Sequence, residues 1–222
     1  VLMNVTEKAP LDTAHLTAAD QWILSRFQDA TRAISSNMEE GEFGLAADRI
    51  YDFAWSEFCD WYIELAKSRL NGDDPVAKKA VQGVLLYVLE GLLKLLHPFM
   101  PFIREEIWQA LPHEGEFLML SKWPEYNEKF RFPAEEEAMQ TVIEAITAIR
   151  ARRNEMNVAP SKKVHYTIAT AHADPFARGI PFFKRLASAS DVTVADANIP
   201  TPDGSIEVVT HAARVLMPLA EL

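Results

Sequence analysis

The stretch VQGVLLYVLEGLLKLLHPFMPFIREEIW, residues 81–108, is the longest strongly apolar part of the chain. Within residues 84–96 the only charges are Glu90 and Lys94, and an acid four residues before a base stabilises one face of a helix. A helix that is apolar over the rest of its circumference must be covered by several neighbours. The stretch therefore predicts the central helix of a helical bundle.

A proline corner follows this helix. Pro98 and Pro101 interrupt the helix, because proline has no N–H to donate and restricts the residue before it. The apolar spacing resumes at Ile103, Ile107 and Leu111, which predicts a second helix after the corner. Charged residues keep every uninterrupted apolar run far below the roughly 18 residues that span a bilayer, so we expect no membrane partner.

Cap signals place the helices that cover this core. Thr17 is a suitable N-cap for a first helix that ends near Gly41, and a second apolar-periodic helix covers residues 44–70. Asp74 and Pro75 are typical of a helix start and open the central helix. Short connections between helices favour antiparallel neighbours.

The second helix carries a dense group of aromatic side chains. At helical spacing beside an apolar hairpin, such a group is typical of a core, and we interpret it as core rather than as a stacking surface. Its members are Tyr51, Trp55, Phe58, Trp61 and Tyr62.

The pattern changes after the bundle. Residues 112–133 lose periodicity and predict an extended strap without a regular helix, whereas residues 134–156 form a fifth helix with an acidic start and a basic end. Beyond Pro160 the apolar period becomes two, which predicts strands, with a short helix at residues 182–189.

These patterns predict a mainly α fold, an antiparallel helical bundle followed by a small α+β lobe. We divide the chain into an entry segment (1–16), a bundle with its strap (17–133), and the fifth helix with the lobe (134–222).

Composition narrows the function. A net charge of −10 argues against a general nucleic-acid coat protein, because such binding depends on basic residues that neutralise phosphates. The single cysteine, Cys59, excludes an internal disulfide and suits a reducing compartment, so we expect a cytoplasmic protein. No histidine pair has zinc-ligand spacing, and neither a glycine-rich phosphate cradle nor a nucleophile elbow is present. We therefore assign no catalytic residue, metal or cofactor to this chain.

One segment is basic against this acidic background. Five cations stand against Glu144 and Glu155 between residues 144 and 163, a local charge of +3 that leaves −13 for the rest. An ordinary solvated face and an RNA-binding patch are both open interpretations. The five cations are Arg150, Arg152, Arg153, Lys162 and Lys163. A second, weaker candidate is Lys67 with Arg69 at the exit of the second helix.

Four segments carry a family resemblance. They are WSEFCDWYIELAKSRL (55–70), LLKLLHPFMPFIREEIW (92–108), SKWPE (121–125) and AIRARRNEMNVAPSKKV (148–164). In this order they resemble the anticodon-binding region of bacterial valyl-tRNA synthetases, which are class I aminoacyl-tRNA synthetases. The proline corner is similar to that of leucyl, isoleucyl and methionyl relatives, whereas the EFCDWY and IRARRNEMNVAPSKK blocks narrow the resemblance to the valyl family.

The resemblance implies that bundle and lobe hold the anticodon stem-loop of valine tRNA, while a catalytic domain elsewhere joins valine to the tRNA with ATP and Mg²⁺. The HIGH and KMSKS signatures and the editing domain are absent from the sequence, so we expect a fragment that is not catalytic by itself. We also expect the family's first bundle helix and its coiled-coil arm to lie outside this chain. DNA is not an expected partner, and the parent protein is expected to be a monomer.

We expect the RNA groove between bundle and lobe, because cations hold phosphates while loop bases are stacked and read at their edges. The five cations of residues 150–163 are the predicted contacts to phosphates and loop backbone. Two other functions stay open, a helical protein–protein interaction module without a nucleic-acid role and a self-contained enzyme with an unrecognised site.

Overall fold

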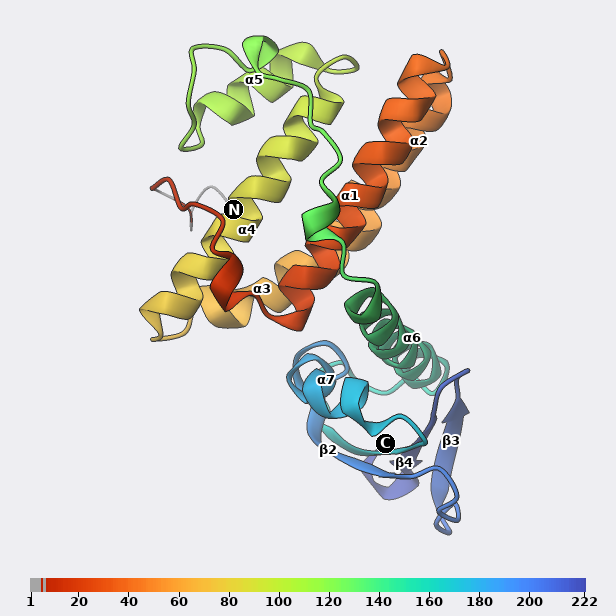
Figure 1. The fold of residues 1–222 in the computed structure, drawn as a ribbon. Coiled ribbons are helices and arrows are strands. Elements are labelled where there is room, and N and C mark those ends of the chain that lie inside the picture. The colour runs from red at the N-terminus through yellow and green to blue at the C-terminus, as the bar shows by residue number, and fades with distance from the viewer. Residues whose placement is uncertain (1–4, 6) are drawn as a thin grey trace. The chain divides into compact units, whose positions relative to one another are not determined.

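The computed structural model describes residue 5 and residues 7–222, and it consists of helices followed by one small sheet (Figure 1). The chain divides into two compact units, the first ending at Glu136 and the second covering Glu137–Leu222. The predicted fold class, a helical bundle followed by an α+β lobe, is confirmed. The helices of the first unit are α1 (Ala18–Glu39), α2 (Phe43–Asp52), a π-helical segment (Phe53–Ile63), α3 (Glu64–Leu70), α4 (Pro75–Leu96) and α5 (Pro101–Gln109). Short 3-10 turns occur at Thr13–His15, Leu118–Leu120 and Glu128–Phe130.

The predicted helix starts are confirmed. Thr17 caps α1 in a capping box, in which its hydroxyl accepts from the Asp20 N–H while the Asp20 carboxylate accepts from the Thr17 N–H. Asp74 caps α4 and Pro75 is its first residue. Gly41, with a φ of 77°, makes the turn between α1 and α2, a conformation that glycine adopts without strain.

The predicted helix at residues 44–70 is helical throughout, but its middle third is π-helical. The side chains that it buries there, Phe53, Phe58 and Tyr62, lie five and four residues apart. This spacing fits the wider π turn rather than the 3.6-residue period, and it rotates the apolar face along the helix.

The rotation corrects the interpretation of the aromatic group. Phe58 and Tyr62 are core residues as predicted, and Trp61 is half-buried. Tyr51 and Trp55 are 64% and 58% exposed, so the prediction that they belong to the core is wrong. They lie four residues apart, Tyr51 in the last turn of α2 and Trp55 in the first turn of the π segment. Four residues are close to one full turn of either helix type, so the two side chains lie on one side of the helix.

The centre of the first unit is α4, as predicted. A Cβ on Gly91 would lie 2.3 Å from Cζ of Phe27, so α1 and α4 approach closely only because residue 91 lacks a side chain. Farther along, α4 and α5 close over one apolar cluster. Its members are Val5, Leu86, Leu93, Trp108, Leu111 and Leu118.

A buried charge pair joins α1 to α3. The Asp20 carboxylate is fully buried, accepts from the Tyr62 hydroxyl at 2.6 Å and pairs with the Arg69 guanidinium at 2.5 Å. Burial and the neighbouring Asp20 carboxylate raise the pKa of Tyr62 well above its usual value, which keeps the hydroxyl a donor. The beginning of α1 is thereby tied to the end of the second helical run, by which we mean α2, the π-helical segment and α3 together.

The strap runs back along α1, as Figure 1 shows. Its residues bond to successive polar side chains of α1: the Trp123 indole N–H donates to Ser35, the Asn127 N–H to Gln28, and the Phe132 N–H to Ser25. The strap contains only the two short 3-10 turns after Phe117, in agreement with the prediction.

The second unit is a four-stranded sheet with two helices. Its elements are α6 (Pro133–Glu155, whose first turn belongs to the first unit), β1 (Val164–Thr170), α7 (Ala173–Leu186), β2 (Ala189–Asp196), β3 (Ser205–Val209) and β4 (Arg214–Pro218). The strand order is β2-β1-β4-β3, with β1 parallel to β2 and the other pairs antiparallel. The predicted short helix at residues 182–189 is confirmed for residues 182–186, but its bounds are wrong, because α7 begins nine residues earlier, continues through Pro181 and ends at Leu186.

We predict that Asp20→Ala lowers the free energy of unfolding of the chain by about 3–5 kcal/mol, because it leaves the Arg69 charge and the Tyr62 hydroxyl without their partner. Urea unfolding followed by circular dichroism measures this loss. Asp73→Ala, at an exposed position, is the control and should change the value by less than about 0.5 kcal/mol. Equal effects of the two substitutions would refute a structural role for the buried pair.

Candidate nucleic-acid interface

The basic cluster of residues 150–163 lies at the end of α6 and in the turn before β1, within the second unit. Its centre, Arg153, is only 6% exposed. The Arg153 guanidinium donates to the Tyr166 hydroxyl at 3.0 Å and to the carbonyls of Ala159 and Lys162 at 3.0 and 2.8 Å. The Tyr166 hydroxyl in turn donates to the Ala187 carbonyl. Arg153 was predicted to contact phosphate directly, but its guanidinium is buried and bonded within the protein. Its hydrogen bonds instead hold the turn before β1 against that strand.

The other four cations of this cluster are exposed, and they differ in how many hydrogen bonds or ion pairs they make within the protein. Arg150 donates through Nε to the Leu186 carbonyl, and Arg152 pairs with Glu155 one helical turn away. Lys162 donates to the carbonyl of the last residue. Lys163 makes no hydrogen bond or ion pair with any residue that the structure describes, which leaves its charge available. The five predicted cations thus lie in one segment of the second unit, and Lys163 is the one whose charge is most available to a ligand.

The second predicted pair, Lys67 and Arg69, lies in the first unit. Lys67 pairs with Glu64 on the same helix face. The Arg69 guanidinium pairs with the Asp20 carboxylate and donates to the Thr17 hydroxyl, and the Arg69 side chain is 18% exposed. Arg69 therefore has a structural role, and Lys67 alone presents a charge at the surface.

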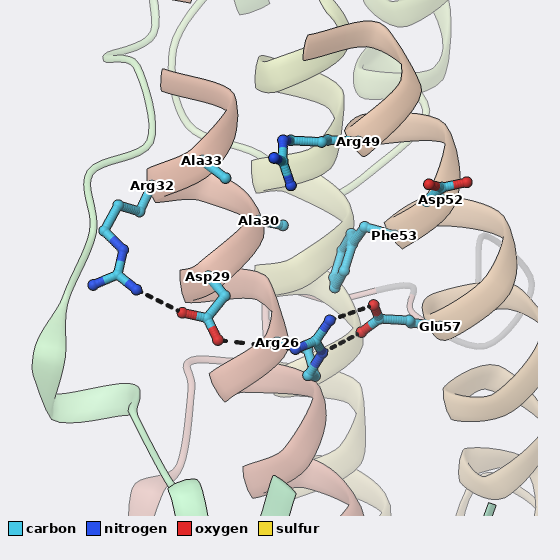
Figure 2. Close-up of a pocket in the computed structure, with 9 residues that line it drawn as sticks. All are labelled: Arg26, Asp29, Ala30, Arg32, Ala33, Arg49, Asp52, Phe53 and Glu57. Carbon is cyan, nitrogen blue, oxygen red and sulfur yellow. Dashed lines mark hydrogen bonds and ion pairs between the residues drawn. The ribbon is translucent and has the colours of Figure 1, made fainter. Parts of the chain in front are cut away.

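A polar hollow that the sequence did not indicate lies between α1 and the second helical run (Figure 2). Its volume is about 450 Å³. One wall is the Phe53 side chain, which is 2% exposed. Three arginines and three acids line the hollow: Arg26, Arg32, Arg49, Asp29, Asp52 and Glu57.

The three arginines differ in their bonding. Arg26 makes a two-pronged pair with Glu57, at 2.8 Å on both sides, and this carboxylate raises the pKa of Arg26. Arg32 pairs with Asp29 and stacks over the Tyr126 ring, with 4.9 Å between its Cζ and the ring centre. Among the residues that the structure describes, Arg49 donates only through Nε, to the side-chain oxygen of Asn37.

Sequence reasoning missed this hollow because its residues are scattered over two helices. The antiparallel packing that the short connections predicted would have paired Arg26 with Glu57 and Asn37 with Arg49, which was the one usable signal. It gave no indication that a space remains between the helices.

In the described part of the chain, no helix has the length and apolar character that crossing a bilayer requires. The same residues contain no group of three or more histidine, cysteine, aspartate or glutamate side chains placed to hold a metal ion.

Comparison with known proteins decides the family. The family model "Anticodon-binding domain of tRNA ligase" matches residues 20–168, from α1 into β1. The chain belongs to this family. This chain is 43% identical to valine–tRNA ligase of Clostridium tetani over 99% of the chain's own length. It is 42% identical to that of Clostridium acetobutylicum over 100% of the chain, and 40% identical to that of Geobacillus stearothermophilus over 93% of the chain.

The chain spans about a quarter of the length of these relatives, between 24% and 26% in the three comparisons. The match to the anticodon-binding family covers the hollow, the exposed Tyr51 and Trp55, and the cluster around Lys163. The resemblance drawn from the four sequence segments is confirmed by these comparisons.

We predict that Arg153→Ala makes amide exchange in β1 at least tenfold faster, the equivalent of roughly 1.4 kcal/mol of local stability, because three hydrogen bonds are lost. Hydrogen exchange with mass spectrometry of peptides covering Val164–Thr170 measures this change. Arg152→Ala removes the same charge from an exposed position and should leave the exchange unchanged. Unchanged exchange in Arg153→Ala, together with weaker RNA binding at low salt, would restore Arg153 as a direct phosphate contact.

Proposed function

We propose that this chain binds the anticodon stem-loop of valine tRNA as part of a valine–tRNA ligase. The observation that carries the proposal is the match of residues 20–168 to the anticodon-binding family. Similarity to three valine–tRNA ligases along nearly the whole chain supports the valine form of that tRNA.

The surface offers the groups that a single-stranded RNA loop requires. Loop bases are stacked on aromatic or guanidinium planes, and cations hold the phosphates between them. Tyr51 and Trp55 expose aromatic rings, on which bases can stack, on one side of the helix. Lys163 and Arg152 supply exposed cations in the second unit, and Lys67 supplies one in the first. In an acidic chain, these local groups favour contact with a short loop rather than with long nucleic acid.

The catalytic role belongs, in this proposal, to the remainder of a longer parent protein. There, valine would be attached to the tRNA with ATP and Mg²⁺, while this chain contributes only recognition. We further propose that the parent is a cytoplasmic monomer. The chain itself has no assigned catalytic residue.

We predict that the chain binds valine tRNA more tightly than a non-cognate tRNA, and that both affinities fall between about 50 and 200 mM salt, because phosphate contacts release counterions. Fluorescence anisotropy with labelled tRNA measures both effects. Binding that does not distinguish the two tRNAs would remove valine specificity from the proposal, and a lack of binding at either salt concentration would refute it.

Lys163→Ala tests the proposed contacts between cations and RNA phosphates. Loss of the Lys163 charge should weaken tRNA binding at about 50 mM salt. It should also make the slope of log affinity against log salt concentration less steep by somewhat under one, as expected for one phosphate contact. The control is Lys79→Ala, at an exposed position on α4. Equal salt slopes for Lys163→Ala and the unsubstituted chain would remove Lys163 from the interface.

One observation favours a second function, a surface that docks another protein. Apolar side chains are exposed at the start of α5 and in the adjoining 3-10 turn, with Phe102 at 89%. An exposed patch of this kind marks an interaction site in many folded proteins. The patch consists of Met100, Phe102, Ile103, Phe117, Met119 and Leu120.

This second function predicts association of the chain that rises with concentration and falls in Phe102→Ser. Sedimentation velocity over a hundredfold range of concentration measures it, and tRNA affinity should not change in the variant. A chain that stays monomeric over the whole range would leave RNA binding as the only proposed function.

A further inference from the structure

We propose that the hollow between α1 and the second helical run receives one unpaired base of the RNA loop, and that Arg49 contacts the acceptor atoms at that base's edge. The inference rests on the proposed function and adds to it a residue and a ligand group. It follows from which donors in the hollow are occupied, how Arg49 is held, and what charge surrounds it.

Arg49 is held in place from one side only. Its Nε donates to the side-chain oxygen of Asn37 at 2.9 Å, and the Asn37 amide donates to the Glu42 carboxylate at 2.8 Å. Because Glu42 accepts from the amide nitrogen, the amide oxygen must face Arg49. Asn37 is itself buried, so the relay fixes the plane of the guanidinium before any ligand arrives.

The two terminal nitrogens of Arg49 remain unused. Within the described residues they make no hydrogen bond or ion pair, and Figure 2 shows the side chain extending from α2 towards α1. Arg26 and Arg32 differ, because a carboxylate already bonds a terminal nitrogen of each, and the Arg32 guanidinium also lies over the Tyr126 ring. The hollow therefore contains one guanidinium whose outer edge can take a ligand with two acceptors side by side.

The charge of the hollow favours a base over a phosphate. Its three arginines are balanced by three carboxylates, so a phosphate entering it would meet little net positive charge. A base is neutral, presents adjacent acceptors that a guanidinium can contact in pairs, and has a flat apolar face. A volume of about 450 Å³ is within the size range of small-molecule sites.

The test uses the whole chain and an anticodon stem-loop RNA with the valine anticodon, in unmodified form and with one loop position at a time made abasic. Arg49→Ala should weaken binding of the unmodified RNA about tenfold, as expected for a paired base contact. Arg49→Lys should weaken it comparably, since lysine keeps the charge but loses the paired donors. Lys79→Ala is the charge-matched control and should leave binding unchanged.

Two readouts identify the ligand group. The loss in Arg49→Ala should be the same factor at about 50 and 200 mM salt, and it should disappear with the RNA that is abasic at one particular loop position. A loss that shrinks at high salt and persists with every abasic RNA would show a phosphate contact and overturn the inference. A loss accompanied by a lower unfolding midpoint and independent of the RNA used would show a structural role and overturn it equally.

The proposed function and this inference fail in different ways. If the unsubstituted chain binds the stem-loop and Arg49→Ala binds it equally well, the base site is wrong and the RNA-binding function stands. If the unsubstituted chain does not bind the stem-loop, both are wrong.

Discussion

The first unit depends on the polar ties between α1 and the antiparallel helical run beside it. Asp20 bonds to Arg69 at one end, Arg26 to Glu57 in the middle, and Asn37 to Arg49 at the other. A buried or half-buried charge is costly without its partner, so sliding of one helix along the other would lose several ties together. The ties fix the register of the two helices, and the hollow is the space left between them.

The helical architecture could be predicted because its signals are local. Thr17, Asp74 and Pro75 mark helix starts whatever the rest of the chain does, and the apolar stretch around Gly91 has to be central wherever it packs. The π-helical segment could not be predicted in this way. Its five-residue step between Phe53 and Phe58 becomes visible only when burial is known, and a 3.6-residue period placed Tyr51 and Trp55 in the core instead.

The bonding of the candidate site residues could not be predicted from the sequence, and their role in RNA binding stays a prediction. Charge in a sequence does not reveal burial, and Arg153 and Arg69 turn inward to bond carbonyls, hydroxyls and a carboxylate. Positions such as Arg49 and Glu57 carried no signal beyond their pairing across antiparallel helices, because each is an ordinary polar residue of a helix. Their importance arises from packing, which brings distant positions around one space and leaves the outer edge of the Arg49 guanidinium without a partner among the described residues.

We propose that RNA enters the first unit between α1 and the second helical run. The most direct measurement is photocrosslinking of the chain to anticodon stem-loops that carry 4-thiouridine at one loop position at a time, with the crosslinked peptides identified by mass spectrometry. We expect one loop position to crosslink to the peptide that contains Arg49 and Phe53 or to the facing residues of α1. Stable binding with every crosslink outside α1, α2 and the π-helical segment would contradict this site.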